Sequence, residues 1–243
     1  MRRAFAAALA LVSGAAAAIP PDLKISTDDL NEAGEQFIEL QANKASRAGP
    51  NAADPRVPFQ FLAEYSYGIT DFWQFALKLP FARDDGVRGL GATAEIRYLG
   101  AHDRGKGGYW GLDVSLGRGR ERAGDEYGTG LDLVPVAGYR SGRWHLAGNV
   151  AVGLPHTGSD RRASFSAAAK AGYSIGGKSE AGLEYFLDAG PFRSWHPRHE
   201  RAEYLLVAWD KVVGNELNVA IGRGLTDASD RRVAKIVYSF PLK

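Results

Sequence analysis

The chain has 243 residues, of which 45% are hydrophobic, with 30 glycines and no cysteine. Its formal net charge of +2 lacks the basic excess typical of nucleic-acid-binding proteins, so no nucleic-acid partner is expected. Without cysteine, no disulfide framework can hold the fold together.

The first eighteen residues have the three parts of a secretory signal peptide. Arg2 and Arg3 form a positive n-region, residues 4–12 form an apolar core, and residues 16–18 form a small-residue cleavage site. We expect residues 1–18 to be cleaved on export and residues 19–33 to form an N-terminal periplasmic segment. Losing both arginines leaves 28 basic residues (30 less 2) against 28 acidic ones, so the mature chain is close to neutral.

From residue 34 onward, apolar and polar side chains alternate with a period of two, which indicates β-strands. The runs predict about twelve strands, and most are about ten residues long, which is the length that a tilted strand needs to cross a bilayer. The predicted strands lie near 35–43, 58–68, 71–81, 91–101, 108–118, 129–140, 143–154, 163–175, 179–189, 201–211, 215–224 and 232–241.

The connections between these strands alternate in length. Long polar segments are predicted at 43–56, 82–89, 117–128, 154–162, 190–200 and 225–232, and short turns at 68–71, 140–143, 176–178 and 213–215, with 99–108 as a longer exception. Short periplasmic turns, longer outer loops and an even strand number are typical of outer-membrane barrels. We therefore predict an all-β fold, in which residues 34–243 form one transmembrane antiparallel up-and-down β-barrel of about 12 strands. The expected location is the outer membrane of a Gram-negative bacterium, with outer-membrane lipid and the barrel-assembly machinery as partners.

In such a barrel, apolar positions face lipid and polar positions line the lumen. Aromatic residues near the strand ends are candidates for the lipid-facing girdles, namely Trp73, Phe75, Phe81, Trp110, Trp144, Tyr238 and Phe240. Charged residues on the opposite face are candidates for the lumen lining, namely Glu64, Lys78, Glu95, Arg97, Asp113, Asp132, Lys170, Glu180, Glu184 and Lys235.

Two short motifs resemble those of the outer-membrane barrel family known as "MetA-pathway of phenol degradation", which is described as transporter-like. The first is YGITDxW at 67–73 followed by LxLPF at 77–81, and the second is GLTDASD at 224–230 before a strand that ends YxFP at 238–241. The resemblance implies an outer-membrane barrel with transport or channel activity, and it supplies no catalytic residue. The chain departs from many outer-membrane barrels because residues 241–243 follow its last aromatic residue.

Three other patterns in the sequence do not predict nucleotide binding, metal binding or catalysis. Residues 172–179, GYSIGGKS, match the P-loop pattern, but strand alternation continues after them, so we predict a tight turn instead of a phosphate-binding helix N-terminus. His196 and His199 fall in a predicted loop without clustered further ligands, so no metal and no cofactor is expected. The predicted lipid face holds no Ser–His pair, and His145 points inward, so the chain is not expected to be an enzyme.

The expected function is passive passage of a small hydrophilic or amphipathic solute, with selectivity from the mixed charges of the inner wall. About twelve strands lies between barrels that side chains fill and barrels with open water channels. Two alternatives stay open. One is a closed structural or ligand-binding barrel whose inner charges pair with one another, such as Lys78 with Glu64 or Glu95. The other is a soluble periplasmic lipocalin-like carrier whose apolar face points inward.

Overall fold

The computed structural model describes residues 22–242 except 47–58, 84–85, 101–102, 104, 121–125, 159–160, 193 and 214. The expected signal peptide and residues 19–21 lie outside the described residues. Strands dominate the described part, with a single three-residue 3₁₀ helix, η1 (Arg198–Glu200), among its elements. Within these ranges, no helix is long and apolar enough to cross a membrane.

Twelve long strands and one short strand make up the sheet. They are β1 (Gln36–Ala45), β2 (Phe59–Thr70), β3 (Trp73–Arg83), β4 (Val87–Gly89), β5 (Gly91–Leu99), β6 (Gly107–Gly119), β7 (Gly128–Ser141), β8 (Trp144–Pro155), β9 (Ser164–Gly176), β10 (Ser179–Pro191), β11 (Ala202–Val213), β12 (Asn215–Gly224) and β13 (Arg232–Pro241). The twelve long strands lie within a few residues of the predicted ranges. The short strand β4, which the sequence did not predict, pairs with the end of β3.

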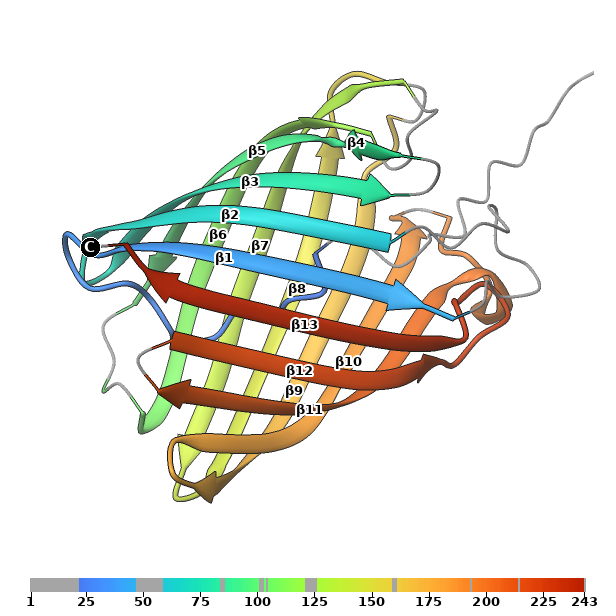
Figure 1. Cartoon of the computed structure of the whole chain (residues 1–243). Helices are drawn as coiled ribbons and strands as arrows, with labels where there is room; N and C mark the ends of the chain where they lie inside the picture. The colour runs from blue at the N-terminus through green and yellow to red at the C-terminus, as the bar shows by residue number, and fades with distance from the viewer. Residues whose placement is uncertain are drawn as a thin grey trace, which may run out of the picture.

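The sheet closes on itself as a barrel (Figure 1). Apart from β4, each long strand pairs antiparallel with the next one along the chain, and β1 pairs with both β2 and β13, so the first and last strands meet. Closure satisfies the backbone N–H and C=O groups of the strands with one another, as a sheet in a bilayer requires. The predicted up-and-down barrel of twelve strands is confirmed.

The two ends of the barrel differ, and we call them the turn end and the loop end (Figure 1). The turn end holds the C-terminus and the connections at 71–72, 100–106, 142–143, 177–178 and 214. The loop end holds the connections at 46–58, 84–90, 120–127, 156–163, 192–201 and 225–231. The alternation of short and long connections is therefore present, with 100–106 as the long exception at the turn end.

Local turn chemistry explains two of the short connections. Gly177 and Lys178 both have positive φ, 60° and 57°, which is the conformation of a tight hairpin turn that matches the twist of its strands. The P-loop pattern is therefore a β9–β10 hairpin. At the β2–β3 turn, Thr70 Oγ1 accepts hydrogen bonds from the backbone N–H groups of Phe72 and Trp73, both at 3.2 Å.

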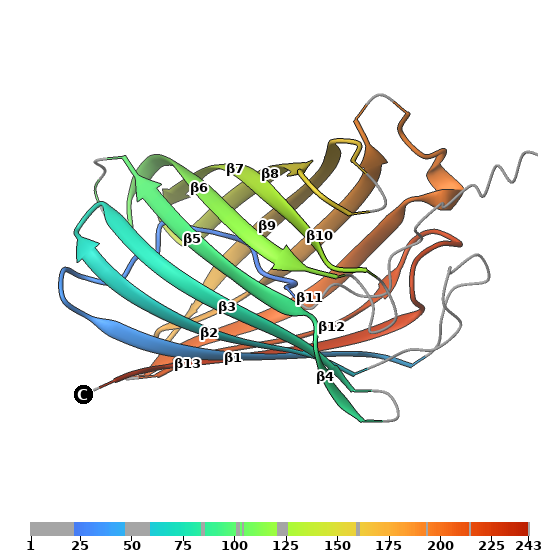
Figure 2. The same cartoon turned by 90° about the horizontal axis from the view of Figure 1, so that it is seen from above.

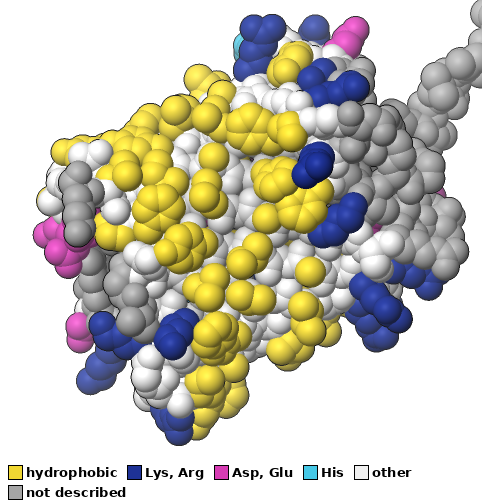
Figure 3. Space-filling model, in the orientation of Figure 1, with side chains coloured by type: hydrophobic (Ala, Val, Ile, Leu, Met, Phe, Trp, Pro, Cys, Tyr) yellow, Lys and Arg dark blue, Asp and Glu magenta, His cyan; other side chains and the backbone are white. Residues whose placement is uncertain are grey.

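Many apolar side chains cover the face of the barrel that Figure 3 shows. Large aliphatic side chains lie exposed on the outside of the barrel, including Leu77, Leu116, Leu146, Leu183, Val207, Ile221 and Ile236. Because each of these residues alternates along its strand with lumen-facing neighbours, the sheet is apolar outside and polar inside. This orientation is the reverse of the lipocalin-like alternative.

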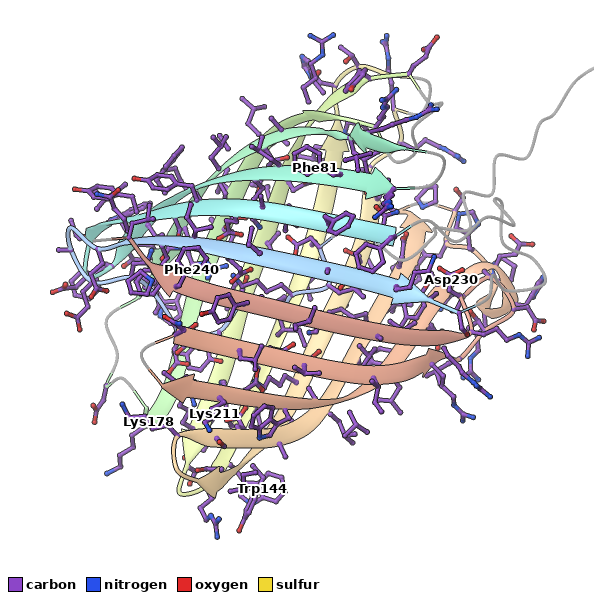
Figure 4. All side chains as sticks on the ribbon, in the orientation of Figure 1. Phe81, Trp144, Lys178, Lys211, Asp230 and Phe240 are labelled. Carbon is purple, nitrogen blue, oxygen red and sulfur yellow. The ribbon has the colours of Figure 1, made fainter. Side chains whose placement is uncertain are left out.

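Aromatic side chains gather near the turn end of the strands. At the turn end, the centroid of the Tyr98 ring lies 4.8 Å from the ring centroid of Trp73 and 5.6 Å from that of Trp110. Three neighbouring strands therefore share one aromatic row. Trp144 packs on Tyr173 at 5.0 Å, and Tyr238 on Phe240 at 5.7 Å. Phe75 lies half-buried near the same end, and Phe81 lies half-buried toward the loop end. Figure 4 shows Trp144 and Phe240 at the turn end and Phe81 farther along the barrel.

Candidate functional site

The wall of the lumen carries charged side chains that pair across neighbouring strands. The Arg97 guanidinium donates two hydrogen bonds to the Asp113 carboxylate, from Nε to Oδ1 at 2.7 Å and from Nη2 to Oδ2 at 2.8 Å. Lys78 Nζ lies 3.0 Å from Glu95 Oε2 and 3.9 Å from Glu64 Oε2. These pairs occupy the β2–β6 side of the wall, and bidentate contacts such as Arg97–Asp113 hold both side chains in one geometry.

A second group of paired charges lies on the β9–β13 side. Lys170 Nζ sits between Glu180 at 2.8 Å and Asp210 at 2.9 Å. Lys235 Nζ lies 2.5 Å from Glu184 Oε2 and donates a further hydrogen bond to the carbonyl of Leu23 at 3.0 Å. Because most wall charges already have partners on the wall, the inner face is charged but close to balanced.

A stretch of chain before β1 runs inside the barrel, and we call residues 22–31 the lumen segment (Figure 2). Residues 19–33 are predicted to form an N-terminal periplasmic segment, and within that range residues 22–31 lie in the lumen, which the chain enters from the turn end. Hydrogen bonds and ion pairs join the lumen segment to eight of the twelve long strands, β1–β3, β5–β8 and β13. The lumen segment thus occupies part of the lumen in the turn-end half of the barrel.

Each charged side chain of the lumen segment faces a wall side chain of opposite charge. Asp22 lies 3.1 Å from Lys78 Nζ, and Lys24 Nζ lies 2.7 Å from Glu39 Oε2. Burial by itself lowers the pKa of the Lys24 ammonium, but the Glu39 and Glu64 carboxylates outweigh burial and hold that pKa above its usual range. Lys24 is therefore charged and paired at neutral pH.

Ser26 fixes the middle of the lumen segment. Its backbone N–H donates to Asn149 Oδ1 at 2.6 Å, and its carbonyl accepts from Asn149 Nδ2 at 2.9 Å. Its hydroxyl donates to Asp113 Oδ2 at 2.7 Å and accepts from Arg97 Nη2 at 2.5 Å. One serine therefore joins the lumen segment to three wall strands, β5, β6 and β8.

Asp28 makes the strongest anchor. Its carboxylate accepts three hydrogen bonds from the Arg140 guanidinium, at 2.9, 2.9 and 2.7 Å. Burial alone raises the pKa of Asp28, but the hydrogen bonds and charge of Arg140 outweigh it and hold the pKa below its usual range. His145 lies beside this pair, 3.8 Å from Asp28 and 3.4 Å from Glu180, with its Nε2 at 3.0 Å from the Tyr109 hydroxyl.

Apolar contacts add to these polar anchors. Leu23, Ile25 and Leu30 of the lumen segment are buried, Leu23 completely so. They belong to one buried cluster with apolar residues of the inner wall, among them Leu99, Val136, Phe186, Tyr204, Leu206, Ala220 and Val233. The inner wall therefore has an apolar sector on β10–β13, which the sequence analysis did not predict because it placed all large apolar side chains on the lipid face.

The first sequence motif positions the entrance of the lumen segment. Gly68 donates a backbone hydrogen bond to the Glu35 carbonyl at 2.9 Å and accepts one from Gly34 at 2.8 Å. A Cβ on Gly68 would collide with the carbonyl oxygen of Glu32. Glycine at this position of the YGITD turn therefore lets the chain cross β2 closely as it turns into the barrel. The similar GLTDASD motif at 224–230 lies at the other end of the barrel, in the loop between β12 and β13.

A cavity of about 670 Å³ remains beside the lumen segment at the turn end. Its lining includes Lys24 and Asp29 of the lumen segment and wall residues from β1, β2 and β9–β13, such as Glu39, Glu64, Glu184, Glu216 and Lys235. Lys178 and Lys211 line it as well, and Figure 4 shows both near the turn end. The cavity therefore opens at the turn end.

Most of the candidate lumen residues take part in the contacts above. Asp132 differs, because its side chain is exposed and has no ion-pair partner among the described residues. It shares a strand face with Arg140, so it points into the lumen. Glu39, Asn149 and the lumen segment itself were missed by the sequence analysis. Residues 22–31 lack the alternation that reveals strands, whereas Glu39 and Asn149 occupy buried polar positions in the alternation of β1 and β8, which is the signal that identifies them.

A closed antiparallel barrel with an apolar exterior and a charged lumen is the fold of outer-membrane β-barrels. No family model matches the sequence, and no curated protein matches it. Among solved structures, the chain is similar to the COG4313 outer membrane channel from Pseudomonas putida F1, with a TM-score of 0.68 and 13% identity over 91% of this chain and 100% of that chain. It is also similar to the KdgM porin, with a TM-score of 0.56 and 9% identity over 85% of this chain and 99% of that one. KdgM in complex with disordered oligogalacturonate gives a TM-score of 0.58 and 8% identity over 84% and 99%. At these identities, the likeness establishes the fold alone.

Proposed function

We propose that this chain is an outer-membrane channel for the passive passage of a small solute, and that the lumen segment is its gate. The observation that carries the proposal is the segment itself, which is held in the lumen by side-chain contacts instead of being part of the barrel wall. A wall that closes without the segment can stay folded when the segment leaves. Release of residues 22–31 would then open the turn-end half of the lumen.

The membrane location rests on the surface of the barrel. Exposed aliphatic side chains cover the outside of the barrel beside the aromatic row at the turn end, and water is a poor solvent for such a surface. Outer-membrane lipid is the partner that this band fits. In that setting the turn end faces the periplasm and the loop end faces outward, and the barrel-assembly machinery would insert the chain.

The channel activity rests on the fold and on the resemblance of the YGITD and LPF motifs to the "MetA-pathway of phenol degradation" family of transporter-like barrels. The structures that share the fold include an outer membrane channel and a porin. Catalysis is less well supported, because the ring partners of His145 are Tyr109, Asp28 and Glu180 and do not include a serine nucleophile. In the described ranges, no group of three or more His, Cys, Asp or Glu side chains could hold a metal ion.

The paired wall charges and the lumen segment inside the barrel also support the second candidate, a closed structural barrel. Single-channel recording of the purified protein in a planar lipid bilayer separates the two. A gated channel gives rare openings in the wild-type chain and frequent openings once the anchors of the lumen segment are removed. A closed structural barrel gives no conductance steps in either case, although heat-shifted gel mobility shows that it is folded.

A further inference from the structure

Two acidic side chains lie next to each other on the lumen wall. In the strand register, Glu39 of β1 is opposite Glu64 of β2 and also opposite Ser239 of β13, which in turn is opposite Glu216 of β12. Residues opposite one another on antiparallel strands project from the same face of the sheet. Like charges in such positions repel each other, so this carboxylate pair needs a cation nearby.

The wall itself does not supply that cation to Glu39. Among the described residues, its only ion-pair partner is Lys24 of the lumen segment, at 2.7 Å. Glu64 lies 3.9 Å from Lys24 and 3.9 Å from Lys78, and the Lys78 ammonium is closer to Glu95, at 3.0 Å. Lys24 therefore compensates most of the negative charge of the Glu39–Glu64 pair. Because Lys24 belongs to the lumen segment, it would move away from the pair when the gate opens.

The pair also has unused hydrogen-bonding capacity. Glu39 is 8% exposed and Glu64 is 4% exposed. Glu39 Oε1 and Glu64 Oε2 are buried and accept no hydrogen bond from the part of the chain that the structure describes. A buried carboxylate oxygen without a donor is costly. Lys24 approaches the other oxygen of each carboxylate, so a mobile ligand with several N–H donors can also use the two oxygens that Lys24 leaves without a donor.

We propose that the Glu39–Glu64 pair binds the primary ammonium group of a small organic amine, and that Lys24 occupies this site in place of the solute while the gate is closed. The inference rests on the proposed function and names its substrate class. An alkylammonium group has the compact charge and three N–H donors of the lysine head group, and Lys24 already fits the site. The site borders the turn-end cavity of about 670 Å³, a volume that suits a small-molecule ligand.

Competition between the solute and Lys24 couples binding to opening. An amine that takes the site displaces Lys24 and so weakens the hold on the lumen segment. Coupling of this kind is reciprocal, so a barrel whose lumen segment is held more loosely must bind the amine more tightly at the Glu39–Glu64 pair. Removing the Lys24 ammonium should therefore raise the apparent affinity for an added amine.

The test uses the full-length Lys24→Ala variant, with propylammonium chloride as the probe. Sodium chloride at equal ionic strength and propanol are the controls. The readout is the temperature at which the folded, heat-modifiable gel band is lost, with open probability measured in parallel. We expect propylammonium to raise that temperature saturably in Lys24→Ala, with at least tenfold weaker apparent affinity in the wild type. Adding Glu39→Gln to Lys24→Ala should weaken the affinity at least tenfold again. Lys211→Ala, which removes another lysine from the cavity lining, should behave as the wild type does.

A shift that does not saturate, or one that Glu39→Gln leaves unchanged, would overturn the ammonium site. If Lys24→Ala does not fold, Lys24→Gln provides the same comparison with a longer neutral side chain. The two proposals fail separately. A saturable shift without conductance in any variant keeps the site and rejects the channel, whereas conductance without a shift keeps the channel and rejects the site.

Discussion

Replacing Asp28 by alanine tests the gate most sharply, because Asp28 carries its strongest anchor. The Asp28 side chain is 4% exposed and accepts three hydrogen bonds from Arg140, whose side chain is 22% exposed. Hydrogen bonds to charged groups contribute about 1.5–3 kcal/mol, and removing one partner of a buried ion pair costs about 3–5 kcal/mol. Arg140 keeps access to water and a contact with Glu180 at 3.9 Å, so we expect the lower part of this range.

Asp28→Ala should thus weaken the closed state by about 2–3 kcal/mol, which raises the ratio of open to closed channels by about 30- to 150-fold. Single-channel open probability in a planar bilayer measures this ratio directly. The matched control is Asp29→Ala, because the Asp29 side chain is 71% exposed and 3.8 Å from Arg140. Exposed pairs of this kind contribute about 0–1 kcal/mol, so the control should change the ratio less than about fivefold. Equal effects of the two substitutions would refute the role of Asp28 as an anchor.

Four further results are expected. Leu77→Arg on the apolar exterior, where Leu77 is 38% exposed, should destabilise the barrel by about 2–4 kcal/mol in urea titrations in lipid bilayers, and an unchanged midpoint would contradict the lipid-facing assignment. Gly68→Ala should displace the entrance of the lumen segment, so that limited proteolysis cleaves residues 22–35 faster than in the wild type while the barrel stays protected. Asp132→Lys should shift the reversal potential of open channels toward anions, since Asp132 is exposed and free of ion pairs among the described residues, and an unchanged potential would remove it from the conduction path. Finally, the Asp28 contact is fully present above the ordinary carboxyl pKa of about 3.9 and is lost as the pH falls through the lower pKa that Asp28 has in the closed state. Open probability should therefore change little between about pH 5 and 9 and rise below about pH 4, and opening already at about pH 6 would mean that another group controls the gate.

The barrel could be predicted from the sequence because a closed sheet in a bilayer imposes a strict period on its strands. Trp110, Leu112, Val114 and Leu116 alternate with polar residues, and this pattern fixes both the strand and the face that it presents. The same rule explains why β4 was missed. Val87–Gly89 is three residues long and follows a loop, so its pairing with β3 leaves no periodic trace.

The gate could not be predicted in the same way. Residues 22–31 have no regular secondary structure, and their position depends on contacts with residues that are distant in the sequence, such as Ser26 with Asn149 and Asp28 with Arg140. No local pattern encodes such contacts. The apolar sector around Phe186 and Leu206 could not be predicted for a related reason. Alternation alone does not distinguish an apolar residue that faces the lumen from one that faces lipid.

The most direct test of the gate is a reversible covalent lock. The chain contains no native cysteine, so Ser26→Cys with Asp113→Cys introduces the only possible disulfide, at a point where the two native side chains meet, with Ser26 Oγ donating to Asp113 Oδ2 at 2.7 Å. The measurement is single-channel conductance of this variant before and after reduction, with each single substitution as a control. The account predicts no openings in the oxidised channel and frequent openings after reduction. Equal conductance in the oxidised and reduced states would contradict the claim that residues 22–31 gate the lumen.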